Sequence, residues 1–407
     1  MKLSKMHVVA CAAAGALMVG LAACGSSKAS KANVITIADT PIGWASYAKD
    51  TDLAGGKVTP PSAEKGTIGG FGGQIVTVKT RDDFIKYAES EEPMVIFVDG
   101  TIDMTDLGNG SMIPETVTGS TFALDKWIAD RTAGTGMAVT SYHDWKVKYT
   151  ASQDGHFDES GEAAEVRAKM DKEWAELIDV NINSNKTIIG LGANSGLFGG
   201  SLFIKNKENV IIRNMNITEC YNPFPEVEAN DGLLDITNES DFVTVSWCIL
   251  RNHDKTQLIG SSDKKTGDAN HQTISLIHNW YDGCGQRLPM VRFATLHIAN
   301  NYYSAGAENT WQRGIDRRKD CKIYSEGNYF EEERRSVTSR SDGNMYDVGS
   351  VNLMRNWLND KPAWNPRDYY DYTAVKATEA KNQALTLAGA GKIPVIYADP
   401  AAINDPK

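Results

Sequence analysis

The stretch from Asn230 to Asn301 decides the fold. It contains N-D-G-L-L-D (Asn230–Asp235), D-F-V-T-V-S-W (Asp241–Trp247) and H-I-A-N-N (His297–Asn301). Apolar residues that favour strands alternate with polar residues in these runs, and Asn, Asp or Gly closes each one. This pattern is typical of short strands separated by turns. Hairpin signals such as N-G between neighbouring strands are largely missing, which argues against a sandwich of antiparallel strands.

A repeat extends from this stretch in both directions. The runs N-V-I-I-R-N-M-N, V-T-V-S-W-C, I-S-L-I-H-N, L-H-I-A-N-N and I-Y-S-E-G-N align so that one column holds Asn216, Cys248, Asn279, Asn301 and Asn328. The spacings are irregular, roughly 20 to 35 residues, as expected when the coils of one solenoid carry loops of different length. Asparagines in one column can hydrogen-bond from coil to coil. The repeat therefore predicts an all-β protein, a right-handed parallel β-helix.

Charged residues of both signs stand between these strands. They are two acids, one lysine and two arginines: Asp231, Asp235, Lys255, Arg287 and Arg292. Carboxylates could hold a hard cation such as calcium, whereas lysine and arginine bind carboxylate groups. The combination suggests an anionic substrate that is reached partly through a bridging metal. We assign a second basic set to the solvated surface and leave it out of the site: Lys264, Lys265, Arg313, Arg317 and Arg318.

The site residues stand in three separate motifs, whose order and spacing resemble those of the pectate lyases of polysaccharide lyase family one. In that family D-G-x-x-D supplies two calcium ligands, which fall here on Asp231 and Asp235. The lysine of H-x-K-x-x-L-x-G falls on Lys255, and the arginines of R-x-P-x-x-R fall on Arg287 and Arg292. The family also has the parallel β-helix fold.

The resemblance implies calcium-dependent β-elimination of polygalacturonate, the de-esterified form of pectin, with 4,5-unsaturated products. Arg287 is then the base that removes the C5 proton. Lys255 binds a substrate carboxylate, and Arg292 binds the substrate or orients the site. Neighbouring cations favour the neutral form of an arginine base, but the cost stays large, so we expect an alkaline pH optimum.

One departure from the family concerns the calcium site. The family usually has an extra coil before D-G-x-x-D, with a further calcium-binding Asp and a W-I-D-H-type strand. Here N-V-I-I-R-N-M-N-I-T (Asn209–Thr218) leads through a short loop directly to Asn230. Glu226 and Glu228 alternate in that loop and could replace the lost ligand. An equally good reading makes both of them solvated loop acids. We expect weak calcium binding until the substrate adds its own carboxylates.

Composition narrows the partners and the redox state. The chain has 407 residues and a formal net charge of -10, which argues against nucleic acid. Calcium or a local basic groove would still permit a polyanionic substrate. The cysteines of the main body have no close C-x-x-C pair, so zinc is not expected; they are Cys220, Cys248, Cys284 and Cys321. We favour buried free thiols over disulfides.

The N-terminus predicts export. Lys2 and Lys5 precede an apolar run that ends in L-A-A-C (Leu21–Cys24). This resembles a bacterial lipobox, which implies a lipoprotein signal peptide over residues 1–23 and a lipid on Cys24. An ordinary secretory signal cut nearby is the alternative. We expect an extracytoplasmic monomer that touches the membrane only through this lipid.

The predicted domain organisation is simple. Residues 24–33 form a linker, and residues 34–400 form a single β-helix domain with an inserted helical excursion around residues 103–180. In the excursion, helical spacing relates Val166, Met170, Trp174 and Leu177, and Ser160 is a plausible N-cap. A further helix is expected over residues 374–387, in a C-terminal tail that packs back along the solenoid.

Two other functions compete. A pectin lyase acts on methyl-esterified pectin, but that branch typically replaces the calcium site with basic residues, whereas Asp231 and Asp235 are present here. A non-catalytic, pectin-binding lipoprotein fits the missing coil, but not the intact Lys255 and Arg287. A polygalacturonase is disfavoured because its G-H-G and R-I-K strings are absent.

Overall fold

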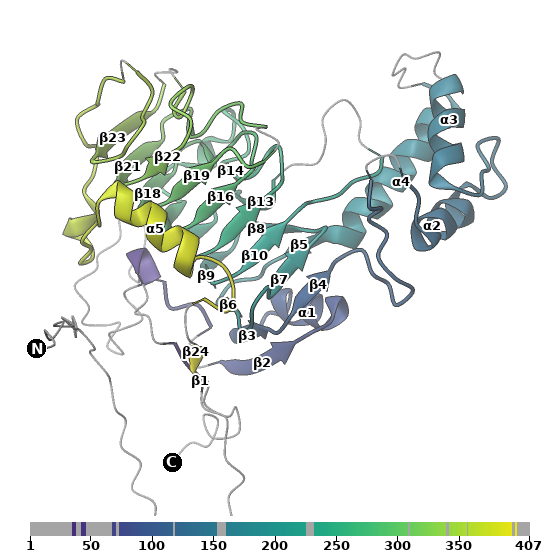
Figure 1. Ribbon diagram of the computed structural model, residues 1–407, viewed down its shortest axis with the longest axis horizontal. Coiled ribbons are helices and arrows are strands. Elements are labelled where there is room, and N and C mark those ends of the chain that lie inside the picture. Colours follow the sequence, from purple (N-terminus) through teal and green to yellow (C-terminus); the bar gives the residue numbers. More distant parts are fainter. Residues whose placement is uncertain are drawn as a thin grey trace, which may run out of the picture.

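The computed structural model describes residues 35–37, 42–45, 67–70, 73–116, 119–152, 160–224, 232–307, 310–338, 342–355, 357–392 and 395–396. Three parallel sheets dominate it (Figure 1). From β3 (Met94–Val98) to β22 (Tyr329–Phe330), successive strands along the chain fall in different sheets, so that one turn of the chain contributes one strand to each sheet. This is the right-handed parallel β-helix that the repeat predicted.

Each sheet runs along the solenoid. The nine-stranded sheet comprises, in spatial order, β2 (Gln74–Val78), β3 (Met94–Val98), β6 (Lys186–Gly190), β9 (Glu208–Arg213), β12 (Asp241–Ser246), β15 (Thr273–Ile277), β18 (Thr295–Ala299), β21 (Lys322–Glu326) and β23 (Asn344–Val348). The seven-stranded sheet comprises β4 (Thr101–Asp103), β7 (Gly196–Phe198), β10 (Asn216–Thr218), β13 (Ile249–Arg251), β16 (Trp280–Asp282), β19 (Tyr302–Ser304) and β22 (Tyr329–Phe330). The six-stranded sheet comprises β5 (Asp179–Asn181), β8 (Ser201–Lys205), β11 (Leu234–Thr237), β14 (Leu258–Ile259), β17 (Met290–Val291) and β20 (Asp316–Arg317).

The core lies inside the coils because side chains alternate along each strand. In β11, Leu234 and Ile236 are fully buried in the main hydrophobic cluster, and Asp235 between them points to the other face. Complete burial of one such aliphatic side chain stabilises the fold by roughly 1.5–3 kcal/mol. Inward columns also contain flat aromatic stacks. Tyr303 lies between Tyr281 and Phe330, with ring centroids 4.8 and 4.4 Å away.

The predicted asparagine column forms a ladder at one corner of the solenoid. The backbone N–H of Asn279 donates to Oδ1 of Asn301 at 2.8 Å, and the N–H of Asn301 donates to Oδ1 of Asn328 at 2.9 Å. The N–H of Cys248 donates in the same way to Asn279. The ladder ends at Cys248, because the cysteine side chain has no amide oxygen that could accept the backbone N–H of Asn216. The N–H of Asn216 instead donates to the carbonyl of Ser195.

The helical excursion contains α2 (Phe122–Thr132), α3 (Tyr142–Ser152) and α4 (Glu162–Ile178). Figure 1 shows these helices projecting beyond β5, at the N-terminal end of the solenoid. Val166, Met170 and Trp174 are buried as their spacing predicted, but Ile178 and not Leu177 completes the buried face. The predicted N-cap is wrong. Gly161 occupies the cap position without a side-chain hydrogen bond, since α4 begins one residue later than a Ser160 cap requires.

The remaining helices cover an end and a side of the solenoid. α1 (Arg81–Ala88) buries Phe84 and Ala88 at the N-terminal end. α5 (Ala377–Leu387) begins later than predicted and packs along the seven-stranded sheet, where Ala384 contacts a small cluster with Ile249 and Tyr302. β1 (Ile35–Ile37) pairs antiparallel with β24 (Val395–Ile396).

The four cysteines of the main body are free and buried, as predicted. Burial raises the pKa of the thiols of Cys248, Cys284 and Cys321 to about 12, so these groups stay protonated and unreactive. The predicted signal peptide, Cys24 and the linker lie outside the described residues. Within the residues that are described, no helix has both the length and the apolar character needed to span a bilayer.

Candidate active site

The three motifs lie on three adjacent coils. β11, β14 and β17 are neighbours in the six-stranded sheet, and the register aligns Ile236 with Ile259 and Ile259 with Val291. Asp235 lies within β11, Lys255 precedes β14, and Arg287 and Arg292 flank β17. The fold therefore brings together residues that are far apart along the chain, since Asp235 and Arg292 are separated by 57 positions.

Asp235 is held tightly in place. Only 2% of the residue is exposed. Its Oδ1 accepts the backbone N–H of Leu258 on the next coil at 2.7 Å, and its Oδ2 accepts the N–H of Gly232 at 3.2 Å. A Cβ at Gly232 would lie 2.1 Å from Oδ1 of Asp235, so D-G-x-x-D requires glycine at its second position. Asp231, Glu226 and Glu228 lie outside the described residues.

Backbone contacts join the neighbouring coils that carry Lys255 and Arg287. Lys255 is 8% exposed and forms a parallel bridge with Gln286, the residue before Arg287. The carbonyl of Arg287 accepts the N–H of Gln257 at 2.9 Å. Arg287 is partly buried and has a φ of 56°, in the left-handed region that non-glycine residues other than Asn, Asp and His seldom adopt. A cis peptide joins Leu288 to the buried Pro289.

Arg292 belongs to an ion cluster that the sequence did not reveal. Its Nε lies 2.5 Å from Oδ1 of Asp263, and its Nη1 donates to the carbonyl of Gly260 at 3.0 Å. Arg318, which follows β20, places Nη2 at 3.3 Å from Oδ2 of Asp263. The hydrogen bond from Arg292 is the largest cause that lowers the pKa of Asp263 below its usual range. Asp263 therefore holds two arginines together at the edge of the six-stranded sheet.

Gly260 makes room for this cluster. A Cβ at Gly260 would lie 2.7 Å from the carbonyl oxygen of Arg292 and 2.9 Å from its Cβ. The last position of H-x-K-x-x-L-x-G thus has to be glycine. Arg318 was assigned to the solvated surface from the sequence, but its side chain is only 17% exposed. The strand register could have identified Arg318. Arg317 pairs with Val291, so the residues that follow them, Arg318 and Arg292, lie side by side.

A polar network that was not predicted from the sequence lies beside Lys255 and Arg287. Gln286 Nε2 donates to Oδ2 of Asp254 at 3.0 Å, and Gln312 Nε2 donates to Oδ1 of the same carboxylate at 2.6 Å. Arg313 Nη2 donates to Oε1 of Gln286 at 2.5 Å. These contacts cross three coils and fix the residue that immediately precedes Arg287.

The described residues fit a calcium site only in part. No group of three or more His, Cys, Asp or Glu side chains that could hold a metal occurs in the part of the chain that the structure describes. Both oxygens of Asp235 accept backbone hydrogen bonds, and a carboxylate has about four acceptor positions in all. Asp235 can therefore contribute to a calcium site, but calcium needs 6–8 oxygens, and the others must come from elsewhere.

Comparison with known proteins agrees with this arrangement. A family model described as pectate lyase matches residues 108–226 and 224–393. A pectate lyase from Bacillus subtilis (strain 168) is 26% identical, over 93% of this chain and 98% of its own. A pectate trisaccharide-lyase from Thermotoga maritima is also 26% identical, over 87% of this chain and 89% of its own.

Solved structures share the fold. A pectate lyase from Acidovorax avenae subsp. citrulli superposes with a TM-score of 0.67 at 19% identity, over 92% of this chain and 99% of its own. A mutant of the Bacillus subtilis pectate lyase gives a TM-score of 0.62 at 24% identity, over 90% of this chain and 100% of its own. With the family model matched over most of the chain and its motifs on adjacent coils, this protein belongs to the pectate lyase family and is a polysaccharide lyase.

Proposed function

We propose that this enzyme cleaves polygalacturonate by calcium-dependent β-elimination and releases 4,5-unsaturated oligogalacturonides. The observation that carries the proposal is the alignment of Asp235, Lys255, Arg287 and Arg292 on three adjacent coils of one sheet. Two relatives of similar length are named pectate lyase and pectate trisaccharide-lyase, which supports the same substrate class.

Arg287 acts as the base in this proposal. It removes the proton from C5, the electrons of the C5–H bond form the C4–C5 double bond, and the bond from C4 to the glycosidic oxygen breaks. The departing oxygen takes a proton from water, and the base later returns its proton to solvent. C5 is adjacent to the substrate carboxylate, so cations near that carboxylate stabilise the developing negative charge. Lys255 and Arg292 are the chain's own cations for this role.

The base has to be neutral when it accepts the proton. Arginine holds its proton above about pH 12 when it is free. Removing that proton is costly near neutral pH, so we expect turnover to rise with pH into the alkaline range.

Asp231 and Asp235 are the proposed calcium ligands. Bound calcium would neutralise a substrate carboxylate as a Lewis acid. Glu226 or Glu228 would supply a further oxygen, or else the substrate's own carboxylates would complete the ligand set. Calcium titrations by calorimetry, with and without oligogalacturonate, distinguish the two. Loss of affinity in Asp231→Ala but not in the variant with Glu226→Gln and Glu228→Gln assigns the missing ligands to the substrate.

The proposed setting is extracytoplasmic. The enzyme would be a monomer, exported with a lipoprotein signal over residues 1–23 and anchored through lipid on Cys24. Residues 34–400 would form one domain that includes the helical excursion. Cys24→Ser should then release the protein from the membrane fraction or block its processing. Unchanged processing and membrane partitioning in this variant would contradict the anchor.

The activity is tested directly by incubation with polygalacturonate while the ultraviolet absorbance of the unsaturated product is followed. We expect product with calcium and none after chelation. Methyl-esterified pectin serves as the second substrate, and faster cleavage of it without calcium would identify a pectin lyase instead. Binding of polygalacturonate without any product under both conditions would identify a non-catalytic pectin-binding protein.

A further inference from the structure

The helical excursion holds a loop of the solenoid through side chains of α3 and α4. This loop, residues 221–224, follows β10 and leads toward the D-G-x-x-D motif. Trp174 Nε1 donates to the carbonyl of Tyr221 at 2.6 Å, and Tyr142 Oη donates to the carbonyl of Pro223 at 3.1 Å. Arg167 Nη1 donates to the carbonyl of Phe224 at 3.3 Å. Two helices thus fix the shape of the loop and of the surface beside it.

A pocket of about 300 Å³ lies between the excursion and this loop. Aromatic rings and cations supply most of its wall, among them Tyr142, Trp145, Lys146, Tyr149, Arg167 and Tyr221. None of the described residues that line it is acidic, although the whole chain has a net charge of -10. Small-molecule sites typically combine such an apolar, aromatic wall with a few charged groups.

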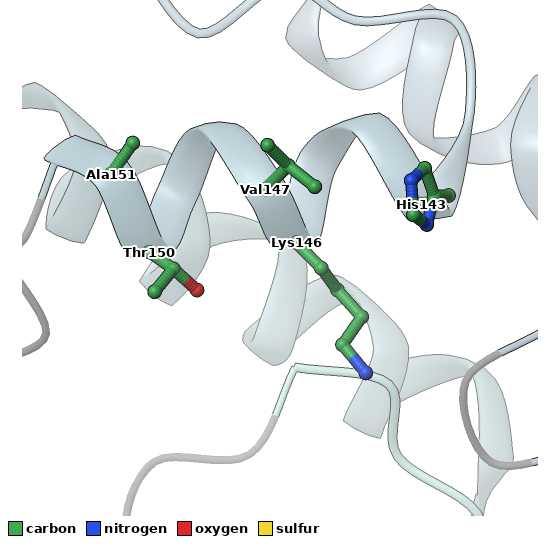
Figure 2. A pocket seen from close by; sticks show the side chains of 5 residues that line it. All are labelled: His143, Lys146, Val147, Thr150 and Ala151. Atoms are coloured by element: carbon green, nitrogen blue, oxygen red, sulfur yellow. The ribbon is translucent and has the colours of Figure 1, made fainter.

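Tyr149 and Lys146 are among the lining residues whose side chains are partly exposed to solvent. Tyr149 is partly exposed, and its ring stacks on the buried Trp145 with centroids 5.2 Å apart and an interplanar angle of 21°. The stack fixes the orientation of the Tyr149 ring. Lys146 also borders a second hollow, of about 540 Å³, on the outer side of α3 with His143 and Val147. Figure 2 shows the Lys146 side chain extended away from the helix backbone.

We propose that this pocket binds one acidic sugar unit of the polymer, outside the cleavage site. The Tyr149 ring packs against the sugar ring, and the Lys146 ammonium pairs with its carboxylate. The occupant is an acidic sugar because the described wall is aromatic and its charged residues, Lys146 and Arg167, are both cations. This inference rests on the proposed function, since it adds a distal contact for the same substrate.

The position of the pocket suits a distal contact. α4 passes directly into β5, the first strand of the six-stranded sheet whose later strands carry Asp235 and Arg292. The helix that forms one wall of the pocket therefore continues into the sheet of the site (Figure 1). In this proposal a polymer bound at the site extends along the sheet toward β5 and reaches the excursion, whereas a trisaccharide bound at the site does not.

The test compares Lys146→Ala and Tyr149→Ala with wild type on polygalacturonate and on trigalacturonate. We expect the KM for the polymer to rise about tenfold, which corresponds to the loss of one charge-assisted contact, with kcat unchanged. The KM for trigalacturonate should stay the same. Lys148→Ala is the matched control, because Lys148 lies on the same helix and donates to the carbonyl of Ala138 instead of lining the pocket.

Binding is measured separately in the Arg287→Ala background by calorimetry. Lys146→Ala should weaken the binding of polygalacturonate there as well, and a neutral galactan oligosaccharide should not compete. Wild-type KM values for both substrates in Lys146→Ala and Tyr149→Ala overturn the inference, as does an equal loss for both substrates. If wild type releases no unsaturated product, the proposed function fails, and the calorimetry still decides whether the pocket binds acidic sugar.

Discussion

The polar and charged residues on the outer faces of two sheets differ in how completely the rest of the chain covers them. On the nine-stranded sheet, His297 is fully buried, with Nδ1 2.7 Å from the hydroxyl of Tyr370 and Nε2 2.9 Å from Glu326. The second oxygen of Glu326 accepts Nη2 of Arg367 at 2.7 Å. Tyr370 and Arg367 come from the C-terminal tail, which thus covers this face and completes a closed network.

On the six-stranded sheet, the C-terminal part of the chain pairs Asp360 with Arg317 of β20 at 2.8 Å, whereas the ion cluster of Arg292 stays partly open to solvent. Asp263 pairs with Arg292 and Arg318 there, but 44% of its side chain remains exposed to solvent. Removing one partner from a closed, buried network leaves the other groups unsatisfied, whereas charged groups that stay partly open to solvent can exchange water for a ligand. The comparison teaches that the tail completes the network on the nine-stranded sheet, whereas the ion cluster beside the site keeps part of its carboxylate open to solvent.

Loss of the proposed base should have the largest effect. Arg287→Ala should lower kcat by ~10²–10⁴, the usual contribution of a general base, while the fold and the affinity for calcium stay nearly unchanged. Steady-state kinetics measures kcat, circular dichroism the fold, and calorimetry the affinity for calcium. Lys169→Ala, on the exposed surface of α4, is the control. Activity close to wild type in Arg287→Ala would assign the base to another residue.

Breaking the covered network should cost stability instead of activity. Glu326→Ala removes the partner of both His297 and Arg367 at a site that is 3% exposed, so we expect a loss of about 3 kcal/mol in the free energy of unfolding. Denaturant titration measures this loss, and kcat at a temperature well below unfolding should not change. Glu176→Ala, at an exposed ion pair of α4, should change neither quantity. A large fall in kcat would show that the two faces are coupled.

A smaller effect is expected at the open face. Asp263→Asn should raise KM about fivefold, since the hydrogen bond that positions Arg292 loses its charge but solvent already screens the pair. Asp263→Glu keeps the charge and should retain most of the affinity. The split between KM and kcat, measured on polygalacturonate, is informative because general destabilisation would not produce it. A lower KM would mean that the carboxylate mainly repels the substrate.

The smallest effect concerns pH. Burial lowers the pKa of His297 below its ordinary 6.5, so the folded protein keeps this residue neutral where the unfolded chain takes up a proton. This contribution to stability is present above about pH 6.5 and declines as the pH falls below it. Burial raises the pKa of Glu326, but hydrogen bonds from His297 and Arg367 outweigh it and leave the pKa below 4.5. Its contribution is present above that pH and is lost only in stronger acid.

His297→Gln is the variant that isolates the first of these contributions. Its free energy of unfolding should depend less on pH than that of wild type between about 5.5 and 6.5, where an unfolded histidine titrates. Parallel curves for the two proteins in this interval would contradict neutral burial of His297.

The sequence predicted the features that repeat from coil to coil. The asparagine column located Asn279, Asn301 and Asn328 because every coil presents the same corner to the next. Lys255, Arg287 and Arg292 were predicted from the resemblance of their motifs to those of the pectate lyases, and their roles remain proposals. Contacts between loops of unequal length were not predictable in this way. Asp263 meets Arg292 and Arg318 only because of how far the loop after Gly260 reaches. The tail residues Tyr370 and Arg367 likewise carry no periodic signal that specifies their partners.

The asparagine ladder has a consequence for how such a protein changes in evolution. Each coil in the ladder offers an amide oxygen on one side and a backbone N–H on the other, and the same two groups recur on the neighbouring coils. Removal or duplication of one whole coil therefore restores the same junction, whereas removal of part of a coil leaves a donor and an acceptor out of step. The solenoid should therefore lengthen or shorten by whole coils. Family members should differ by whole numbers of coils, and only their loops should vary in length residue by residue.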